Sequence, residues 1–382
     1  MGNRIYMDHA ATTGVAPEVL EAMLPYFGEV YGNASSIHTT GREAAKAVEK
    51  ARKQVAAAIG AEPREIFFTG SGTESDNLAL RGIAEARGSG HMITSAVEHH
   101  AVLRTCEKLR QKGFAADILP VDPRGVLHPE TVENAVREDT ILISVMAANN
   151  EIGTVEPIAE IAGIAGEHGI PFHMDAVQAM GDLDIRVKDL HIDLMSISAH
   201  KFYGPKGAGA LYIREGLRLE PLTTGGMQER KMRPGTENVP AIVGMGAAIE
   251  IAARDREANR KQCRRMRDLL ISGILDTIPD CRLNGDPENR LSNNCSFTFA
   301  GINGEALLLR LDLAGIACSS GSACTAGSVE PSHVLLAIGL TEEEADSSLR
   351  LTPGKETTEE EVRETIRTIG EIVRDLREMR FS

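Results

Sequence analysis

The stretch His173-Met-Asp-Ala-Val-Gln178, followed by Ser196-Ile-Ser-Ala-His-Lys-Phe-Tyr-Gly204, decides the fold of this chain. Residues 170–175 form an apolar run that closes on an acid, and residues 193–198 form a second run that ends in a serine. Short apolar runs bounded by polar residues are typical of buried strands. Two neighbouring strands would bring their polar ends to one edge of a sheet, where open α/β sheets bind ligands.

Lys201 can be interpreted in two ways. Glycines follow it at positions 204, 207 and 209, and small neighbours let the backbone approach a bound group. A desolvated lysine amine forms a Schiff base with an aldehyde such as pyridoxal 5'-phosphate (PLP), which also needs a carboxylate and phosphate donors. Asp175 and the Ser198/His200 pair would fill these roles, with Gln178 at the same edge. The alternative is a solvated lysine in a glycine-rich loop and an aspartate that caps a helix.

The composition limits the functional classes. With 382 residues, 42% of them hydrophobic, the chain can bury a large core and divide into two domains. The formal net charge of -14 disfavours a nucleic-acid or membrane-surface partner. We expect neither a membrane span nor a signal peptide, because no long apolar run occurs. The six cysteines lack CxxC or framework spacing, which favours free thiols in the cytoplasm and no metal site.

The order of apolar strands and helical segments predicts two units. Between residues 60 and 213 they alternate, which indicates a mostly parallel sheet covered by helices on both faces. From about residue 280 the order changes to that of a smaller α+β unit. We therefore predict a large α/β domain over 15–260 and a small domain made of 1–14 and 261–382.

Two Thr-x-x-Glu patterns predict helix starts. Thr40 with Glu43 precedes one apolar helical stripe, and Thr358 with Glu361 precedes another. A long helical stretch over 240–275 includes a basic part, which we interpret as a solvated face and not as a nucleic-acid site.

Further candidate site residues stand near predicted strand ends. Gly72 and Thr73 lie in a glycine turn that opens a helix, where a phosphate is favoured, although any strand–helix unit can use such a turn. His99 would be a cap, a core residue or a ring over a cofactor. Asn150 follows another strand. Arg350 would meet a substrate carboxylate or, as local sequence favours, form a surface ion pair.

A loop rich in Ser, Gly and Ala joins Cys318 to Cys324. Cys324 has no apolar neighbour beyond alanine, so we predict a solvent-exposed and reactive thiol, against the alternative of an ordinary surface thiol. Cys318 follows an apolar run and should end a strand, partly buried. A disulfide between the two cysteines is a further alternative.

Together these stretches resemble the NifS/IscS-like cysteine desulfurases, which are fold-type I PLP enzymes of the class-V aminotransferase family. The resemblance runs nearly from end to end of the chain. Its motifs are Tyr6-Met-Asp-His-Ala-Ala-Thr-Thr13, Ser71-Gly-Thr-Glu-Ser-Asp-Asn77, Glu98-His99, Asn149-Asn-Glu-Ile-Gly153, Asp175-Ala-Val-Gln178, Ser198-Ala-His-Lys201 and Ser319-Ser-Gly-Ser-Ala-Cys324.

The resemblance implies roles around the cofactor ring. Lys201 would hold PLP covalently, and Asp175 would pair with its ring nitrogen. Gln178 would bond the ring hydroxyl, and His99 would stack on the ring and help to transfer protons. The remaining cofactor contacts, mainly to the phosphate, would come from Gly72, Thr73, Asn150, Ser198, His200 and, from the second subunit of a homodimer, Thr236.

The resemblance also implies a reaction and its partners. Asn150 and Arg350 would hold L-cysteine, and Cys324 would take its sulfur as a persulfide, leaving L-alanine. The sulfur would pass to an acceptor protein, either an iron–sulfur scaffold or a tRNA-thiolation enzyme, without direct contact with nucleic acid or membrane.

Other functions compete with a desulfurase. Selenocysteine lyase is one, and an aminotransferase is another, although an aminotransferase needs no thiol such as that of Cys324. A non-catalytic scaffold that only docks sulfur carriers is a third, and the intact Lys201, Asp175 and His99 argue against it.

Overall fold

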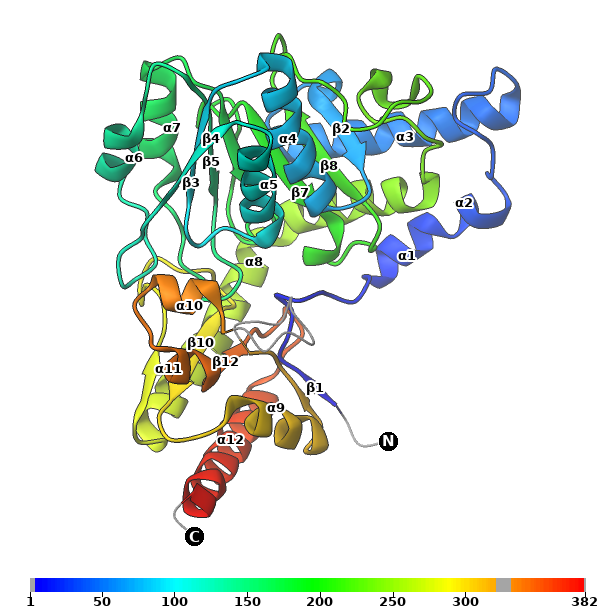
Figure 1. The fold of residues 1–382 in the computed structure, drawn as a ribbon. Helices are drawn as coiled ribbons and strands as arrows, with labels where there is room; N and C mark the ends of the chain where they lie inside the picture. Colours follow the sequence, from blue (N-terminus) through cyan, green and yellow to red (C-terminus); the bar gives the residue numbers. More distant parts are fainter. Residues whose placement is uncertain (1–3, 321–330, 381–382) are drawn as a thin grey trace.

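The computed structural model describes residues 4–320 and 331–380, and its centre is a sheet of seven strands. In spatial order these are β2 (Ile66–Thr69), β8 (Gly209–Ile213), β7 (Leu194–Ser198), β6 (Phe172–Asp175), β5 (Thr140–Met146), β3 (His91–Ser95) and β4 (Ala115–Leu119). Only β8 runs antiparallel to its neighbours in this sheet (Figure 1). The predicted, mostly parallel sheet is confirmed, and the parallel direction brings the ends of β5, β6 and β7 to one edge.

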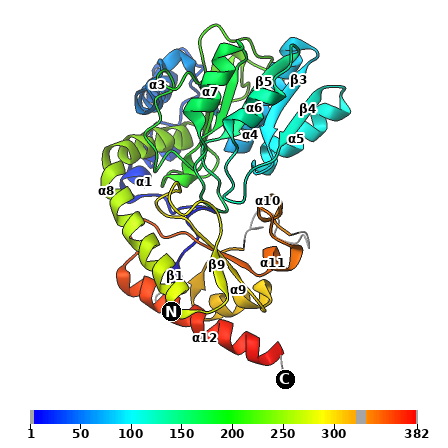
Figure 2. The ribbon, with the colours of Figure 1, turned by 90° about the vertical axis from the view of Figure 1, so that its left-hand side faces the viewer.

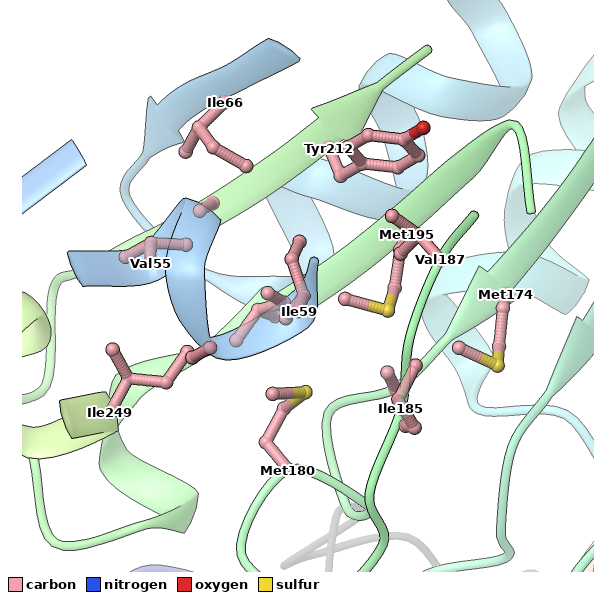
Figure 3. Packing of buried hydrophobic residues seen from close by; sticks show 14 of the residues in the cluster. Val55, Ile59, Ile66, Met174, Met180, Ile185, Val187, Met195, Tyr212 and Ile249 are labelled. Carbon is pink, nitrogen blue, oxygen red and sulfur yellow. The ribbon is translucent and has the colours of Figure 1, made fainter. Parts of the chain in front are cut away.

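Helices cover both faces of this sheet, because neighbouring strand residues point to opposite sides. One face packs against α1 (Pro17–Met23), α3 (Thr39–Ile59), α6 (Pro129–Ala135), α7 (Ile158–Glu167) and the first half of α8 (Val239–Thr277). The other face packs against α4 (Gly72–Arg87) and α5 (His100–Gln111). Figure 3 shows Val55 and Ile59 of α3 next to Ile66 and Met195 of the sheet. The short α2 (Pro25–Gly28) follows α1, and its Tyr26 packs against the same core.

A smaller unit packs against the second half of α8 (Figure 2). Its strands are β9 (Cys281–Leu283), β10 (Cys295–Phe299) and β12 (Ser348–Leu351), with β10 in the middle, and the parallel pair β1 (Ile5–Tyr6) and β11 (Ile316–Ala317). Its helices are α9 (Gly304–Leu313), α10 (His333–Ala337), α11 (Glu342–Asp346) and α12 (Glu359–Arg380). The smaller α+β unit is therefore confirmed.

The predicted boundary between the two domains falls inside a continuous helix. The large core includes residues as far along the chain as Ala252, and the small core includes Met266 and, from the chain start, Met7. Residue 260 lies between these cores on α8, so the division stays a prediction. Within residues 4–320 and 331–380, every helix is too short or too polar to span a lipid bilayer.

The two predicted capping boxes have different outcomes. At α12, the Thr358 amide donates to Glu361 at 2.8 Å, and the Glu361 amide donates to the Thr358 hydroxyl at 3.2 Å, as predicted. The box at Thr40 and Glu43 was wrong. α3 already begins at Thr39, and His38, which is extended, accepts the Gly41 amide with its ring at 3.2 Å. Because Thr40 is inside the helix, its hydroxyl has no cap position to fill.

Candidate functional site

A cavity of about 300 Å³ lies at the edge of the sheet where β5, β6 and β7 end. Most of the predicted site residues line it: Gly72, Thr73, His99, Asn150, Asp175, Gln178, Ser198, His200, Lys201 and Arg350. Thr236 is exposed and does not line this cavity, and Cys324 lies outside the described residues. Residues far apart in sequence thus meet because parallel strands end at one edge.

Lys201 enters this cavity from the single turn that follows β7. Its Nζ donates to the carbonyls of Ala10 and Ala11, the latter at 2.9 Å, so the amino-terminal segment forms part of the wall. A Cβ at position 204 would lie 2.8 Å from the Ala199 carbonyl oxygen, and therefore this tight turn needs glycine there. Gly204, three residues after the lysine, thus shapes the turn that carries Lys201.

His200 faces the amino-terminal segment. Its Nδ1 lies 3.1 Å from the Thr12 hydroxyl. Burial, together with the charges of Lys201 and Lys206, lowers the pKa of His200 to about 4. The ring is therefore neutral at pH 7 and can serve as a hydrogen-bond donor or acceptor without adding charge.

Asp175 ends β6 and is the acid of the cavity. One of its oxygens accepts the Val177 amide at 2.9 Å. Burial raises the pKa of Asp175 to about 6, while the Val177 hydrogen bond and the Lys201 charge act in the opposite direction. A buried carboxylate with this profile gains stability when a cation is placed beside it.

His99 is both the cap of α5 and a cavity residue. Its Nδ1 accepts the Ala101 amide at 3.1 Å, which leaves the proton of the neutral ring on Nε2. Burial first, and then the charges of Lys201, His100 and His333, lower the pKa of His99 to about 4. The cap interpretation is confirmed, and because the same ring also lines the cavity, its place over a cofactor stays a prediction.

The start of α4 forms the end of the cavity that suits an anion. The Ser71 hydroxyl accepts the Glu74 amide at 3.1 Å, and Gly72 and Thr73 begin the helix. A Cβ on Gly72 would lie 2.7 Å from a methyl of Val177, so only glycine lets α4 start this close to the strand ends. The amides and positive dipole end of a helix favour a phosphate here.

Arg350 lies on β12 and is only 2% exposed, so the surface ion pair favoured by local sequence was wrong. Its guanidinium donates to Asp8 at 2.9 Å and to the Asn150 carbonyl at 3.1 Å. Its Nε is buried and has no hydrogen-bond partner among the described residues, although the side chain lines the cavity. A carboxylate would satisfy this donor.

Two acids of the site were missed. Asp8 bonds Arg350, and its other oxygen accepts the Ser319 hydroxyl at 2.8 Å, which ties down the start of the cysteine-bearing loop. Asp76 is 1% exposed and lines the cavity, and burial and Asp175 raise its pKa well above the usual range. Helical spacing was the available signal, because Gly72 and Asp76 are four residues apart on one face of α4.

Cys318 follows β11 and is partly buried, as predicted. Burial, with the charge of Asp8, raises the pKa of its thiol to about 12. Such a thiol is a poor nucleophile at neutral pH. Across the described part of the chain, no three His, Cys, Asp or Glu side chains cluster as metal ligands would.

Comparisons with known proteins agree on one family. The aminotransferase class-V model matches residues 5–364. Cysteine desulfurase IscS of Methanosarcina thermophila is 54% identical over 98% of this chain and 93% of its own. A solved NifS-like protein shares 40% identity with a TM-score of 0.92, over 98% of this chain and all of the other. SspA, solved in complex with cysteine, shares 39% identity with a TM-score of 0.83, over 93% of this chain and all of the other.

Proposed function

Because the chain belongs to the aminotransferase class-V family, and within it to the cysteine desulfurases, we propose that it takes sulfur from L-cysteine with PLP held at Lys201. The fold is that of the fold-type I enzymes, as the solved NifS-like protein indicates. The observation that supports the residue assignments is that one cavity is lined by Lys201, Asp175 and Arg350, whose buried Nε has no partner among the described residues.

The residues of the cavity fit PLP. Asp175 is a buried carboxylate that a protonated ring nitrogen would stabilise, and Lys201 is the amine for the covalent link. The helix start at Gly72 and Thr73, with Ser198 and His200, offers donors for the phosphate. Gln178, whose amide nitrogen donates to the Ala10 carbonyl at 2.9 Å, would reach the ring hydroxyl with its other end. When bound, PLP supplies an electron sink for bonds at the substrate's α-carbon.

The protein groups then orient the substrate and move protons. Arg350 binds the L-cysteine carboxylate with its planar fork, beside Asn150. Lys201 accepts and returns a proton at Nζ, and His99 provides a neutral ring with its proton on Nε2. The SspA structure with bound cysteine supports the choice of substrate.

Cys324 is the proposed sulfur acceptor within the chain. One sulfur atom would pass from L-cysteine to its thiol: the Cβ–S bond of the substrate breaks, an S–S bond forms on Cys324, and Cβ takes up a proton, so that one enzyme persulfide and one L-alanine form. The high pKa of Cys318 leaves that cysteine a poor alternative. The persulfide sulfur then passes to an acceptor protein for iron–sulfur cluster assembly or tRNA thiolation.

A homodimer with shared sites is part of the proposal. Large apolar side chains are exposed between α1 and α3, namely Leu24, Phe27, Tyr31 and Ile37, the last at 91% exposure. Such a patch favours a protein partner, and two-fold pairing of identical chains is the commonest assembly. Thr236 is exposed, as a residue that serves the second subunit would be. Sedimentation at micromolar concentration should give a dimer, and a fully active monomer would refute the shared sites.

The chain would work in the cytoplasm. All the cysteines that the structure describes are free thiols: Cys106, Cys263, Cys281, Cys295 and Cys318. Free thiols, most of them buried, suit a reducing compartment.

Incubation of the PLP-loaded protein with L-cysteine tests the function. We expect alanine and persulfide in equal amounts, with the persulfide on Cys324 by peptide mapping. Cys324→Ala should bind PLP but form no persulfide, whereas Cys318→Ala should keep most activity. A persulfide found on Cys318 with Cys324 unmodified would overturn the assignment. When selenocysteine replaces L-cysteine in the same assay, release of selenide would show that it is a second substrate.

A further inference from the structure

The loop between β8 and α8 contains a strained segment that the proposed chemistry does not use. Glu229, Arg230 and Lys231 are consecutive and have φ angles of 42°, 54° and 71°. Residues with side chains rarely adopt this left-handed region, and three in succession persist only when surrounding contacts determine them. Figure 1 shows this yellow-green segment beside β2 and α3.

Glu229 supplies those contacts. It is 6% exposed, and its carboxylate accepts two hydrogen bonds from Arg52 of α3, at 2.7 and 2.8 Å. The same carboxylate accepts the Phe68 amide of β2 at 2.8 Å. A buried carboxylate with three charge-assisted or amide donors is fixed in one position.

Neighbouring arginines complete the attachment to β2, the outermost strand of the sheet. Arg52 and Arg230 both donate to the Ile66 carbonyl, at 2.8 and 2.6 Å. The Arg230 guanidinium also lies 4.1 Å above the centre of the Phe67 ring. Side chains of the loop and of α3 thus occupy the hydrogen-bonding groups that a further strand would take.

The loop then reaches the turn that precedes α4. Arg233 donates to Glu74 at 2.8 Å, and the other oxygen of Glu74 accepts the Gly70 amide at 2.7 Å. Thr236 stands three residues after Arg233 and is exposed on the surface. The contact of Arg233 with Glu74 therefore holds the loop close to Thr236, the residue proposed to serve the second subunit.

We propose that Glu229 is a positioning residue that holds this loop in its strained conformation, so that Thr236 is presented to the cofactor phosphate in the other subunit. The inference rests on the proposed function, because it takes from it the homodimer and the role of Thr236. Glu229 touches neither cofactor nor substrate, and its effect on the cofactor passes between subunits.

Glu229→Gln keeps the size of the side chain and removes its charge. The cofactor-free variant should bind PLP at least ten-fold more weakly than the unchanged protein, measured as the pyridoxyl group that borohydride fixes on Lys201 at increasing PLP. Glu215→Gln is the matched control, since Glu215 is an exposed acid paired with Arg64. It should bind PLP within two-fold of the unchanged protein.

Mixed dimers show in which subunit Glu229 acts. A Glu229→Gln chain paired with a Lys201→Ala chain has one Lys201, and that site receives its Thr236 loop from the chain with intact Glu229. We expect PLP binding at this Lys201 to return to the unchanged value. Binding that stays as weak as in the Glu229→Gln homodimer would mean that Glu229 acts within its own subunit, and an unweakened Glu229→Gln homodimer would show that it has no such role. Either result overturns the inference.

Thr236→Ala serves as the reference, in the homodimer and paired with Lys201→Ala. If Thr236→Ala does not weaken PLP binding, the shared site of the proposed function fails. If Thr236→Ala is rescued by pairing and Glu229→Gln is not, only the role of Glu229 fails. Should Glu229→Gln not fold, Glu229→Asp, which keeps the charge but shortens the reach, is taken through the same pairs with the same expectations.

Discussion

The two units of the molecule bury ionisable side chains of opposite type. Among the described residues of the large unit the buried charged side chains are mostly carboxylates: Glu65, Asp76, Glu98, Glu151, Glu156, Asp175, Asp182 and Glu229, with Arg52 as the exception. In the small unit they are mostly guanidiniums, namely Arg267, Arg290 and Arg350, with Asp286 as the exception. Carboxylates become neutral by taking up a proton, whereas arginine keeps its charge at any ordinary pH.

A change in pH can therefore alter the charge of the buried carboxyl groups in the large unit, but not that of the buried arginines in the small unit. Burial raises the pKa of Asp175 to about 6 and that of Glu151 to about 7, so the large unit exchanges protons near neutrality. Burial lowers the pKa of Arg290 only to about 10, which leaves it charged. Arg290 instead donates to backbone carbonyls, and Arg350 offers a fixed positive charge to the cavity. In the proposed function, proton transfer and the covalent link to the cofactor would therefore fall to the large unit, and the fixed charge that meets the substrate carboxylate to the small unit.

Lys201→Ala should have the largest effect. Lys201 is the only lysine that lines the cavity within the described residues. The guanidinium of Arg350, which also lines the cavity, cannot replace it, because a guanidinium does not form the covalent link. We expect at least a 10³-fold loss of kcat/KM, with no pyridoxyl group fixed by borohydride. Lys206→Ala, an exposed lysine of the same loop, is the control and should stay within two-fold. Normal alanine release by the Lys201 variant would sink the assignment.

Arg350→Lys tests the fixed charge of the small unit. Lysine keeps the charge but loses the planar fork and the unpartnered Nε, so the substrate carboxylate should bind less tightly. We expect KM for L-cysteine to rise about 30- to 100-fold, or ~2–3 kcal/mol, with a smaller change in kcat. Arg282→Lys, an exposed arginine on β9 of the same three-stranded sheet, should leave both constants unchanged. A fall in kcat alone would point to a different role for Arg350.

Local sequence was enough to predict the strand ends of the large unit. Asp175 and Ser198 each close an apolar run, and parallel neighbours bring such ends together whatever lies elsewhere. Strand β4 was not predicted, because Asp117 interrupts its short run Ala115–Leu119. Its pairing with β3 along the whole run outweighs that weak local preference.

Long-range contacts explain what the sequence could not predict. Arg350 resembled a surface residue, and only its contacts with Asp8 and the Asn150 loop bury it. Asp76 is part of the motif Ser71-Gly-Thr-Glu-Ser-Asp-Asn77, but its burial depends on the strands that pack against α4. The proposed role of Thr236 needs a second copy of the chain, so neither its local sequence nor one subunit could define that role.

Arg290→Met should lower stability and not activity. The Arg290 guanidinium donates to the carbonyls of Asp286, Ile152 and Asn294 at 2.9 to 3.2 Å, and methionine would leave all three buried acceptors without this donor. We expect the free energy of unfolding in urea to fall by about 2–3 kcal/mol, while kcat/KM of the folded enzyme is retained. Arg264→Met, an exposed position on α8, should change the unfolding free energy by less than about 0.5 kcal/mol. An equal loss in both variants would mean that the buried hydrogen bonds contribute nothing.

Glu156→Gln should have an effect on stability that is visible only as a function of pH. Burial raises the pKa of Glu156 to about 8; the Leu127 amide, which donates to it at 2.9 Å, lowers this pKa, and the charge of the nearby Asp122 raises it further. The folded protein therefore holds a proton that the unfolded chain releases above its ordinary pKa of about 4.5.

The sign follows from this difference in bound protons. Between pH 5 and pH 8 the folded state binds more protons than the unfolded state, so this carboxyl makes the protein less stable as pH rises. Glutamine has no such proton, and the stability of the variant relative to the unchanged protein should rise by up to about 1.4 kcal/mol per pH unit. Urea unfolding at pH 5.5, 6.5 and 7.5 measures the slope, with Glu160→Gln, an exposed acid of α7, as the control with no slope. Parallel curves for Glu156→Gln and the unchanged protein would mean that Glu156 is ionised in the fold, and the large unit would then hold one more buried negative charge at neutral pH.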